Sequence, residues 1–186
     1  MSVNVSRRVT AACPGCPSAR HPVVATVPPE SRLRGEEEVA EVRVDDERAV
    51  IAALVRYATA IDTKDWALLA GCFFPAAKFT AGSLVLDGVD EIVEYMRAAH
   101  HHIDGSQHRL SNFAIRLSDD GRTAHSTTYL DALIVHRAHR DGPTLRVVST
   151  YHDVFECAGD TWRIAKRAVS SLWREGSPTI LGPTVD

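Results

Sequence analysis

The first strong pattern in the sequence is a helical spacing of apolar residues that begins near Val44. Two acidic residues, Asp45 and Asp46, precede it, and such side chains accept hydrogen bonds from the first amides of a helix. The apolar positions then stand three or four residues apart, as on one face of a helix: Ile51, Leu54, Ala58 and Ile61. The pattern predicts an amphipathic helix over about residues 46–62.

A second, shorter helical segment follows at once. Asp65 can cap a helix from Trp66 to Phe73, and Pro75 would end it. Residues 78–86 alternate only weakly, which predicts a short strand pair or an irregular connection before a turn at residues 87–88. The first two helices therefore form a hairpin.

A third helix is predicted from a cap at Asp90 to a cluster of three histidines, residues 100–102. Protonated imidazoles suit the C-terminus of a helix, where the helix dipole is negative. Successive helical residues point about 100° apart, so the three side chains cannot all bind one metal ion. The cluster is therefore interpreted as a solvated helix end.

The rest of the chain has the composition of β-strands. Turn signals separate four segments rich in β-branched and aromatic residues: 107–117, 123–136, 145–157 and 161–173. An antiparallel sheet of this kind must cover its apolar face, and the three helices are the layer available to do so. The sequence thus predicts an α+β fold, a cone-shaped barrel in which a strongly curved antiparallel sheet wraps on three N-terminal helices.

The chain is expected to hold one domain, because 186 residues are too few for two of ordinary size. We predict a poorly ordered leader over residues 1–43, the domain over 44–175 and a tail over 176–186. The leader is rich in proline and small residues and lacks apolar periodicity. Its Cys13 and Cys16 form a lone pair without further zinc ligands at suitable spacing, and Arg7-Arg8 is not followed by the apolar run of an export signal.

The net charge and the composition limit the classes of binding partner that we expect for this chain. A formal net charge of -3 and a pI near 6.3 give no basic surface for a nucleic acid. No apolar run is long enough to cross a membrane, and four scattered cysteines favour a reducing, cytoplasmic location over a disulfide framework. Without a phosphate-binding loop, a dinucleotide fingerprint or a convincing ligand set, we expect a small-molecule substrate and neither an organic cofactor nor a metal.

Six short motifs stand in order along the predicted domain: Ile61–Trp66, Phe73–Ala77, Gly88–Ile92, Gln107–Asn112, Tyr151–Asp153 and Trp162–Ile164. Together they resemble the SnoaL-like, or nuclear transport factor 2-like, superfamily, nearest to its scytalone dehydratase-like and bile-acid dehydratase-like members. The resemblance covers about residues 44–175. It implies a homodimer or homotrimer that associates through the open face of the sheet.

The resemblance also implies a catalytic site. In members of the bile-acid type, residues of matching kind and spacing serve as the catalytic set, and here they are Tyr57, Asp62, His108 and Asp131. The basic residue that such members place on the last strand corresponds to Arg167.

The chemistry of these side chains agrees with that implication. His108 can take and give protons near neutral pH. Asp131, if on the neighbouring strand beside it, can fix its tautomer, and the Tyr57 hydroxyl can donate to a carbonyl or enolate oxygen. Asp62 can hold a leaving hydroxyl group or a water molecule. Each residue also has a purely structural explanation, since a strand histidine is often a hydrogen-bonded core residue and Asp62 can bond nearby amides.

Two further residues are candidates for substrate binding. Tyr129 shares a strand face with Asp131. His152 alternates with its neighbours Tyr151 and Asp153, and only one of the two sets can face the cavity.

These residues predict a dehydratase or isomerase that acts beside a carbonyl group of a polyketide-like or alicyclic molecule. A SnoaL-like polyketide cyclase would use the same acid and base, and a non-catalytic binding or dimerisation module would need neither.

Overall fold

Helices followed by long strands make up the protein, which is represented by a computed structural model that describes residues 30–182, with side chains from residue 43. In chain order the elements are α1 (Glu30–Thr63), α2 (Trp66–Gly71), β1 (Phe73–Ala81), β2 (Leu84–Asp87), α3 (Val89–Ala99), β3 (Gly105–Leu117), β4 (Thr123–Val135), β5 (Thr144–Ala158), β6 (Thr161–Gly176) and the 3-10 helix η1 (Pro178–Leu181). The predicted α+β class is confirmed.

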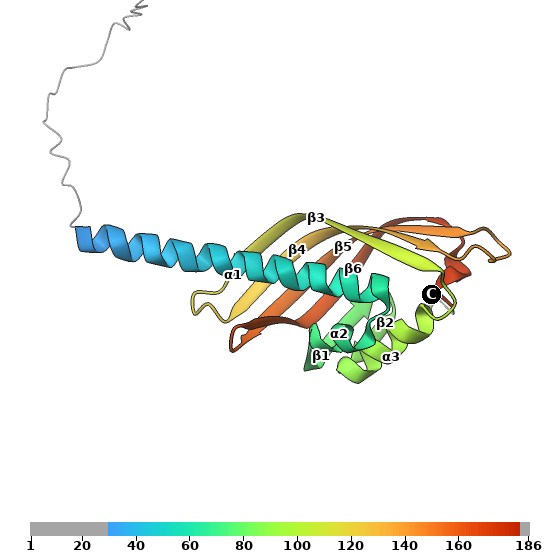
Figure 1. The fold of residues 1–186 in the computed structure, drawn as a ribbon, viewed down its shortest axis with the longest axis horizontal. Helices are drawn as coiled ribbons and strands as arrows, with labels where there is room; N and C mark the ends of the chain where they lie inside the picture. Colours follow the sequence, from blue (N-terminus) through green and yellow to red (C-terminus); the bar gives the residue numbers. More distant parts are fainter. Residues whose placement is uncertain (1–29, 183–186) are drawn as a thin grey trace, which may run out of the picture.

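The helices follow the predicted order but not all of the predicted bounds. α1 begins at Glu30 rather than near residue 46, because the Glu- and Arg-rich segment before Val44 has good helix propensity although it lacks an apolar stripe. This first part of α1 extends beyond the end of the sheet (Figure 1). The Asp65 side chain caps α2 as predicted, by accepting a hydrogen bond from the Leu68 amide at 2.9 Å. Gly88, and not Asp90, is the capping residue of α3.

The short strand pair expected over residues 78–86 is present as the antiparallel pairing of β1 with β2, but the sequence analysis missed the first half of β1 and its pairing with β6. β1 starts at Phe73, where a helix was predicted, and it pairs in parallel with β6 and antiparallel with β2. The pairing with β6 is irregular between Phe73 and Lys78, around Pro75, which has no amide hydrogen to donate to a sheet. Because β6 lies about ninety residues away in sequence, no local pattern indicates that β1 pairs with it.

The four long strands form the predicted antiparallel meander, but the sheet does not close. Its order is β2-β1-β6-β5-β4-β3, so β2 and β3 are edge strands in the described part of the chain. The predicted cone-shaped, strongly curved and purely antiparallel sheet is therefore wrong in detail, and the observed sheet is open, six-stranded and mixed (Figure 1). The parallel addition of β1 to β6 widens the sheet instead of bringing its two edges together.

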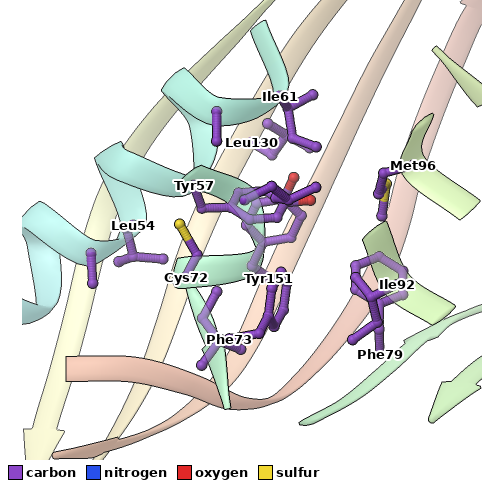
Figure 2. Close-up of a cluster of buried hydrophobic side chains, with 14 of the residues drawn as sticks. Leu54, Tyr57, Ile61, Cys72, Phe73, Phe79, Ile92, Met96, Leu130 and Tyr151 are labelled. Carbon is purple, nitrogen blue, oxygen red and sulfur yellow. The ribbon is translucent and has the colours of Figure 1, made fainter. Parts of the chain in front are cut away.

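The core lies between α1 and the covered face of this sheet. Buried side chains alternate along β4 with exposed or half-buried ones, and they meet an apolar stripe of α1 that includes Val50, Leu54 and Ile61. Figure 2 shows Leu54, Tyr57 and Ile61 of α1 in this cluster with Phe73 and Tyr151. Each such side chain contributes about 1.5–3 kcal/mol through its burial. The outer face of the sheet carries no helix in Figure 1.

Several sequence-based predictions fall on other parts of the chain. The Arg7-Arg8 pair and the Cys13–Cys16 pair lie outside the described residues. Within residues 30–182, none of the helices is long and apolar enough to cross a membrane.

Candidate active site

The most complete polar arrangement on the covered side joins His108 of β3 to Asp62 at the end of α1. The His108 Nδ1 atom lies 2.7 Å from Asp62 Oδ1, and the His108 backbone amide donates to Asp62 Oδ2 at 2.8 Å. Ser106 Oγ also donates to Asp62 Oδ1, at 2.7 Å. The side chains of His108 and Asp62 are 9% and 22% exposed. One carboxylate thus fixes both the backbone and the ring of His108.

The position of Asp62 follows from how α1 ends. The helix stops at Thr63, and Lys64 has a φ of 55°, which turns the chain toward α2. Lys64 Nζ donates to the Ile103 carbonyl at 2.7 Å and so ties the end of the helix to the segment before β3. Asp62 is therefore held beside the first residues of β3.

These contacts determine the tautomer of the neutral imidazole. A carboxylate oxygen only accepts, so the His108 Nδ1 carries the hydrogen and the Nε2 keeps a lone pair. Burial acts to raise the pKa of Asp62, but the hydrogen bonds from His108 and Ser106 outweigh it and hold that pKa below its usual value. Asp62 stays ionised at neutral pH and can stabilise a protonated His108.

A second polar group is fully buried under α1. Arg167 of β6 forms a two-point ion pair with Asp153 of β5, at 2.7 and 2.8 Å, with both side chains 0% exposed. The Arg167 guanidinium lies 4.0 Å from the ring centres of both Tyr57 and Tyr151. The two rings meet edge to face, with their centres 6.0 Å apart, and both contact this one cation. Arg167 is thus a buried neighbour of Tyr57, and its predicted part in substrate binding stays a prediction.

The hydroxyl groups of the two tyrosines lie beside each other (Figure 2). In Figure 2 their oxygens point toward α3, from which Met96 projects. Burial raises the pKa of Tyr57 and raises that of Tyr151 further, so both hydroxyl groups keep their protons at neutral pH. Two protonated phenols can donate hydrogen bonds to one ligand oxygen.

A cavity of about 170 Å³ brings these groups together. Tyr57, Tyr151 and His108 line it with side chains from α3, β4 and β5, most of which are apolar, among them Met96, Leu130, Ala132, Ile134 and Leu145. The arrangement offers a base with a free lone pair, hydroxyl donors that include Tyr57 and Tyr151, and a largely apolar wall. Such a cavity suits a small cyclic molecule with a few polar substituents.

His100 was missed as a member of this site. It was interpreted as part of a solvated helix end, but it is buried, 5% exposed, and lines the same cavity. The sequence holds a signal for this, since Ile92, Met96 and His100 are spaced by four and so share one helix face. His101 and His102 are exposed, as expected.

Three predicted site residues lie on the opposite face of the sheet. Asp131 binds Arg146 at 2.8 Å and Arg109 at 3.1 Å, and it is not beside His108. Tyr129 is 52% exposed on the same strand face, and His152 is also exposed because Tyr151 and Asp153 are the inward set of β5. The expectation that Asp131 orients His108 and that Tyr129 and His152 line the cavity is wrong, and the orienting carboxylate is Asp62.

A backbone irregularity explains why Asp131 and His108 separate. The β3–β4 register shifts by one residue between Ser111 and Ala114, where Asn112 has a φ of 52°. Extending the register of the pair Ala114–Thr127 would place His108 opposite Leu133, on the face of Asp131. Because of the bulge, His108 instead stands opposite Ala132, on the covered face.

Among the residues with described side chains, no group of three or more His, Cys, Asp or Glu could hold a metal ion. The polar groups of the cavity are two imidazoles, phenols and a serine, Ser149, with Arg174 as a lining cation.

Comparison with known proteins relates the chain to one family. The sequence profile of the SnoaL-like domain matches residues 42–168. No curated protein sequence matches the chain. Solved structures do match: a candidate scytalone dehydratase from Novosphingobium aromaticivorans has a TM-score of 0.69 at 16% identity, over 74% of this chain and 91% of that one.

Two further similar structures come from the same genus. A candidate aromatic ring hydroxylase from Novosphingobium aromaticivorans has a TM-score of 0.67 at 22% identity, over 74% of this chain and 97% of that one. A hexachlorocyclohexane dehydrochlorinase from Novosphingobium barchaimii has a TM-score of 0.64 at 12% identity, over 75% and 94%. At these identities the similarity shows a shared fold.

Proposed function

The chain belongs to the SnoaL-like domain family, and on that premise we propose that it is an acid/base enzyme, a dehydratase or isomerase that acts beside a carbonyl group of an alicyclic or polyketide-like small molecule. The observation that carries the proposal is the half-buried pair of His108 and Asp62, with His108 lining a largely apolar cavity that Tyr57 and Tyr151 also line. The proton transfers in this proposal need only side chains of the chain itself.

His108 acts as the base and then as the acid. Its Nε2 takes the proton from the carbon beside the carbonyl group, and the electron pair of that C–H bond forms an enolate. Asp62, already bonded to Nδ1, stabilises the imidazolium that results. The enolate electrons then expel the β-hydroxyl group, which leaves as water with the proton carried by Nε2. A positioned acid/base group of this kind contributes about 10²- to 10⁴-fold to a rate.

Tyr57 and Tyr151 stabilise the charge that develops on the carbonyl oxygen. Both side chains line the cavity, and Arg167 contacts both rings and so holds them in place. Hydrogen-bond donors fixed before the reaction stabilise a developing oxyanion because they need no rearrangement, and each is worth about 3–4 kcal/mol in well-studied cases. Arg167 is a positioning residue in this scheme.

The same groups also fit two neighbouring reactions. An isomerase would return the proton to another carbon, and a SnoaL-like polyketide cyclase would use the enolate to close a ring. We favour elimination because two proteins that share the fold are named for it, a candidate dehydratase and a dehydrochlorinase. A non-catalytic binding module would not require Asp62 to hold the His108 ring.

Mass spectrometry in heavy water tests the proposal with two simple cyclic ketones in place of the natural substrate. The full chain is incubated with cyclohexanone and with 3-hydroxycyclohexanone. We expect deuterium to enter beside the carbonyl group of the first and water to be lost from the second. Deuterium uptake without water loss would contradict the dehydratase and favour the isomerase or cyclase. If neither change occurs, the result favours the binding module.

Two histidine variants make the test specific. His108→Gln should lower both rates by about 10²- to 10⁴-fold. His152→Gln is the matched control, since His152 is an exposed strand histidine on the outer face, and it should retain the rates of the unmodified protein. Equal rates in all three proteins would show that His108 is not the base.

A further inference from the structure

His100 stands at the end of α3 with one ring nitrogen bonded and the other on the cavity side. Its Nδ1 lies 2.8 Å from the Met96 carbonyl oxygen. A carbonyl oxygen only accepts, so Nδ1 carries the hydrogen and Nε2 has a lone pair in the neutral ring. His100 is buried, and its ring packs edge-on against Trp66, with the ring centres 6.4 Å apart.

Ending the helix does not require this side chain. The backbone amide of His100 already donates to the same Met96 carbonyl, at 3.0 Å. The imidazole is also kept neutral, because burial lowers the pKa of His100 to about 4. At neutral pH it is therefore a fixed hydrogen-bond acceptor in the wall of the cavity that His108 lines.

The two histidines both require a hydrogen-bond donor from the ligand. Both Nε2 atoms are acceptors in the neutral rings, and most of the cavity wall is apolar, with the tyrosines, Ser149 and Arg174 as the other polar side chains that line it. A ketone oxygen can use the two tyrosine hydroxyl groups but has nothing to donate to an imidazole lone pair. A buried acceptor left without a donor costs free energy, so a ligand that supplies a hydroxyl group is favoured over one that does not.

We propose that His100 is a substrate-binding residue that accepts a hydrogen bond from a ring hydroxyl group, so that the preferred substrates are hydroxylated cyclic compounds. The inference rests on the proposed function for the position of the reacting carbonyl group. Its test is a binding measurement, which does not depend on turnover.

Two unreactive test ligands isolate the hydroxyl group. Resorcinol has two hydroxyl groups, and 3-fluorophenol replaces one of them with a fluorine of similar size that cannot donate. Calorimetry on the full chain should show tighter binding of resorcinol, by about tenfold. In protein with ¹⁵N-labelled histidine, the His100 Nε2 resonance should shift on binding of resorcinol.

Variants at neighbouring positions complete the design. His100→Leu should bind the two ligands with equal affinity, and His100→Gln, which keeps an acceptor, should recover part of the preference. His101→Leu is the matched control, because His101 is adjacent but exposed, and it should behave like the unmodified protein.

Two results would overturn the proposal. One is a resorcinol preference that persists in His100→Leu, and the other is a His100 Nε2 resonance that does not move when resorcinol is bound. Loss of the preference in His100→Leu while His108→Gln still shows full turnover would instead support His100 and reject the proposed base. The two proposals therefore fail separately.

Discussion

The carboxylates on the two faces of the sheet differ in how deeply their ion-pair partners are buried. On the covered face, Asp62 binds a nearly buried histidine and Asp153 binds an arginine that is 0% exposed. On the outer face, Asp131 binds Arg146, and the side chains of that pair are 30% and 46% exposed. All three carboxylates have short, well-placed partners, so distance does not separate them. Their surroundings do: water screens the Asp131 pair, whose partner is 46% exposed, more than the Asp62 pair, whose partner is 9% exposed, and it does not reach the Asp153 pair.

The contrast teaches that a strand residue's face, and not its type, decides its chemistry. His108 and Arg109 are adjacent in sequence, yet the first faces the cavity and the second faces outward to Asp131. Neighbouring strand residues point to opposite sides, so a shift of one residue exchanges the two roles.

The largest expected difference between the faces is in catalysis. Asp62→Asn removes the carboxylate that fixes the His108 tautomer, and the rate of deuterium uptake or water loss should fall by about 10²- to 10⁴-fold. Asp131→Asn makes the same chemical change on the outer face and should leave the rate within about twofold, since substitutions far from reacting groups have small effects. Equal losses in the two variants would mean that the faces are not distinct in function.

The second-largest difference between the two faces is expected in the free energy of unfolding. Asp153→Asn leaves the Arg167 charge buried without its partner, which should lower the free energy of unfolding by about 3–5 kcal/mol. Asp131→Asn breaks a partly exposed pair, and such pairs contribute about 0–1 kcal/mol. Urea unfolding of both variants at neutral pH measures the difference. A small loss in Asp153→Asn would show that the buried pair is not a main support of the core.

The bulge in β3, which determines on which face of the sheet His108 lies, can also be tested. Asn112 has a positive φ, which asparagine and glycine tolerate and β-branched residues do not. Asn112→Val should therefore cost about 1–2 kcal/mol of stability, whereas Asn112→Gly should cost much less. Thermal unfolding of the two variants measures this. If valine is tolerated as well as glycine, the strand does not hold the left-handed conformation at this position.

Much of the fold could be read from the sequence, because its signals are local. The stripe of Ile51, Leu54 and Ile61 predicts the part of α1 that packs on the sheet, and the turns between β3, β4, β5 and β6 predict the meander. The short pair of β1 with β2 was expected, but the pairing of β1 with β6 could not be predicted, since β6 is distant in sequence. The closed cone failed for the same reason, because the order of strands at a sheet edge is a tertiary property.

The site could be predicted in part. Tyr57 and His108 line one cavity and Asp62 binds His108, so three of the predicted residues lie together. The partner of His108, however, was assigned to Asp131. A spacing of 23 residues between His108 and Asp131 does not reveal a one-residue bulge between their strands. His100 was overlooked because its burial depends on packing against Trp66, and nothing in the run of three histidines shows that one of them points inward.

The pH dependence of stability should follow the covered carboxylate. The folded protein holds the pKa of Asp62 below its ordinary value of about 3.9. Its stabilising contribution is therefore complete above about pH 4 and is lost as the pH falls through the lowered value. The difference in unfolding free energy between the unmodified protein and Asp62→Asn should shrink below about pH 4.

The effect of salt on this acid dependence distinguishes Asp62 from Asp131 on the outer face. Hydrogen bonding from Arg146 lowers the pKa of Asp131 as well, but exposed pairs are screened at about 1 M salt, where the Debye length is about 3 Å. High salt should therefore remove most of the acid dependence due to Asp131 and little of that due to Asp62. If high salt changes the acid dependence of stability equally in Asp62→Asn and Asp131→Asn, the difference in screening between the two faces is contradicted.

The smallest effects are expected at the outer residues that sequence reasoning placed in the cavity. Tyr129→Phe should leave the affinity for resorcinol and the melting temperature nearly unchanged, because the Tyr129 side chain is half exposed and outside the cavity. Association of two or three chains through this face stays a prediction of the family resemblance. A changed affinity in Tyr129→Phe would show that this face communicates with the cavity.

The direct test of the central assignment is the protonation state of the His108 ring, measured by ¹⁵N NMR of histidine-labelled protein at a pH where the ring is neutral. We predict a hydrogen on Nδ1 and a lone pair on Nε2, a pattern that Asp62→Asn alters and Asp131→Asn leaves unchanged. A hydrogen on Nε2 in the unmodified protein, or an equal response to both substitutions, would contradict the proposal that Asp62 prepares His108 to act as the base.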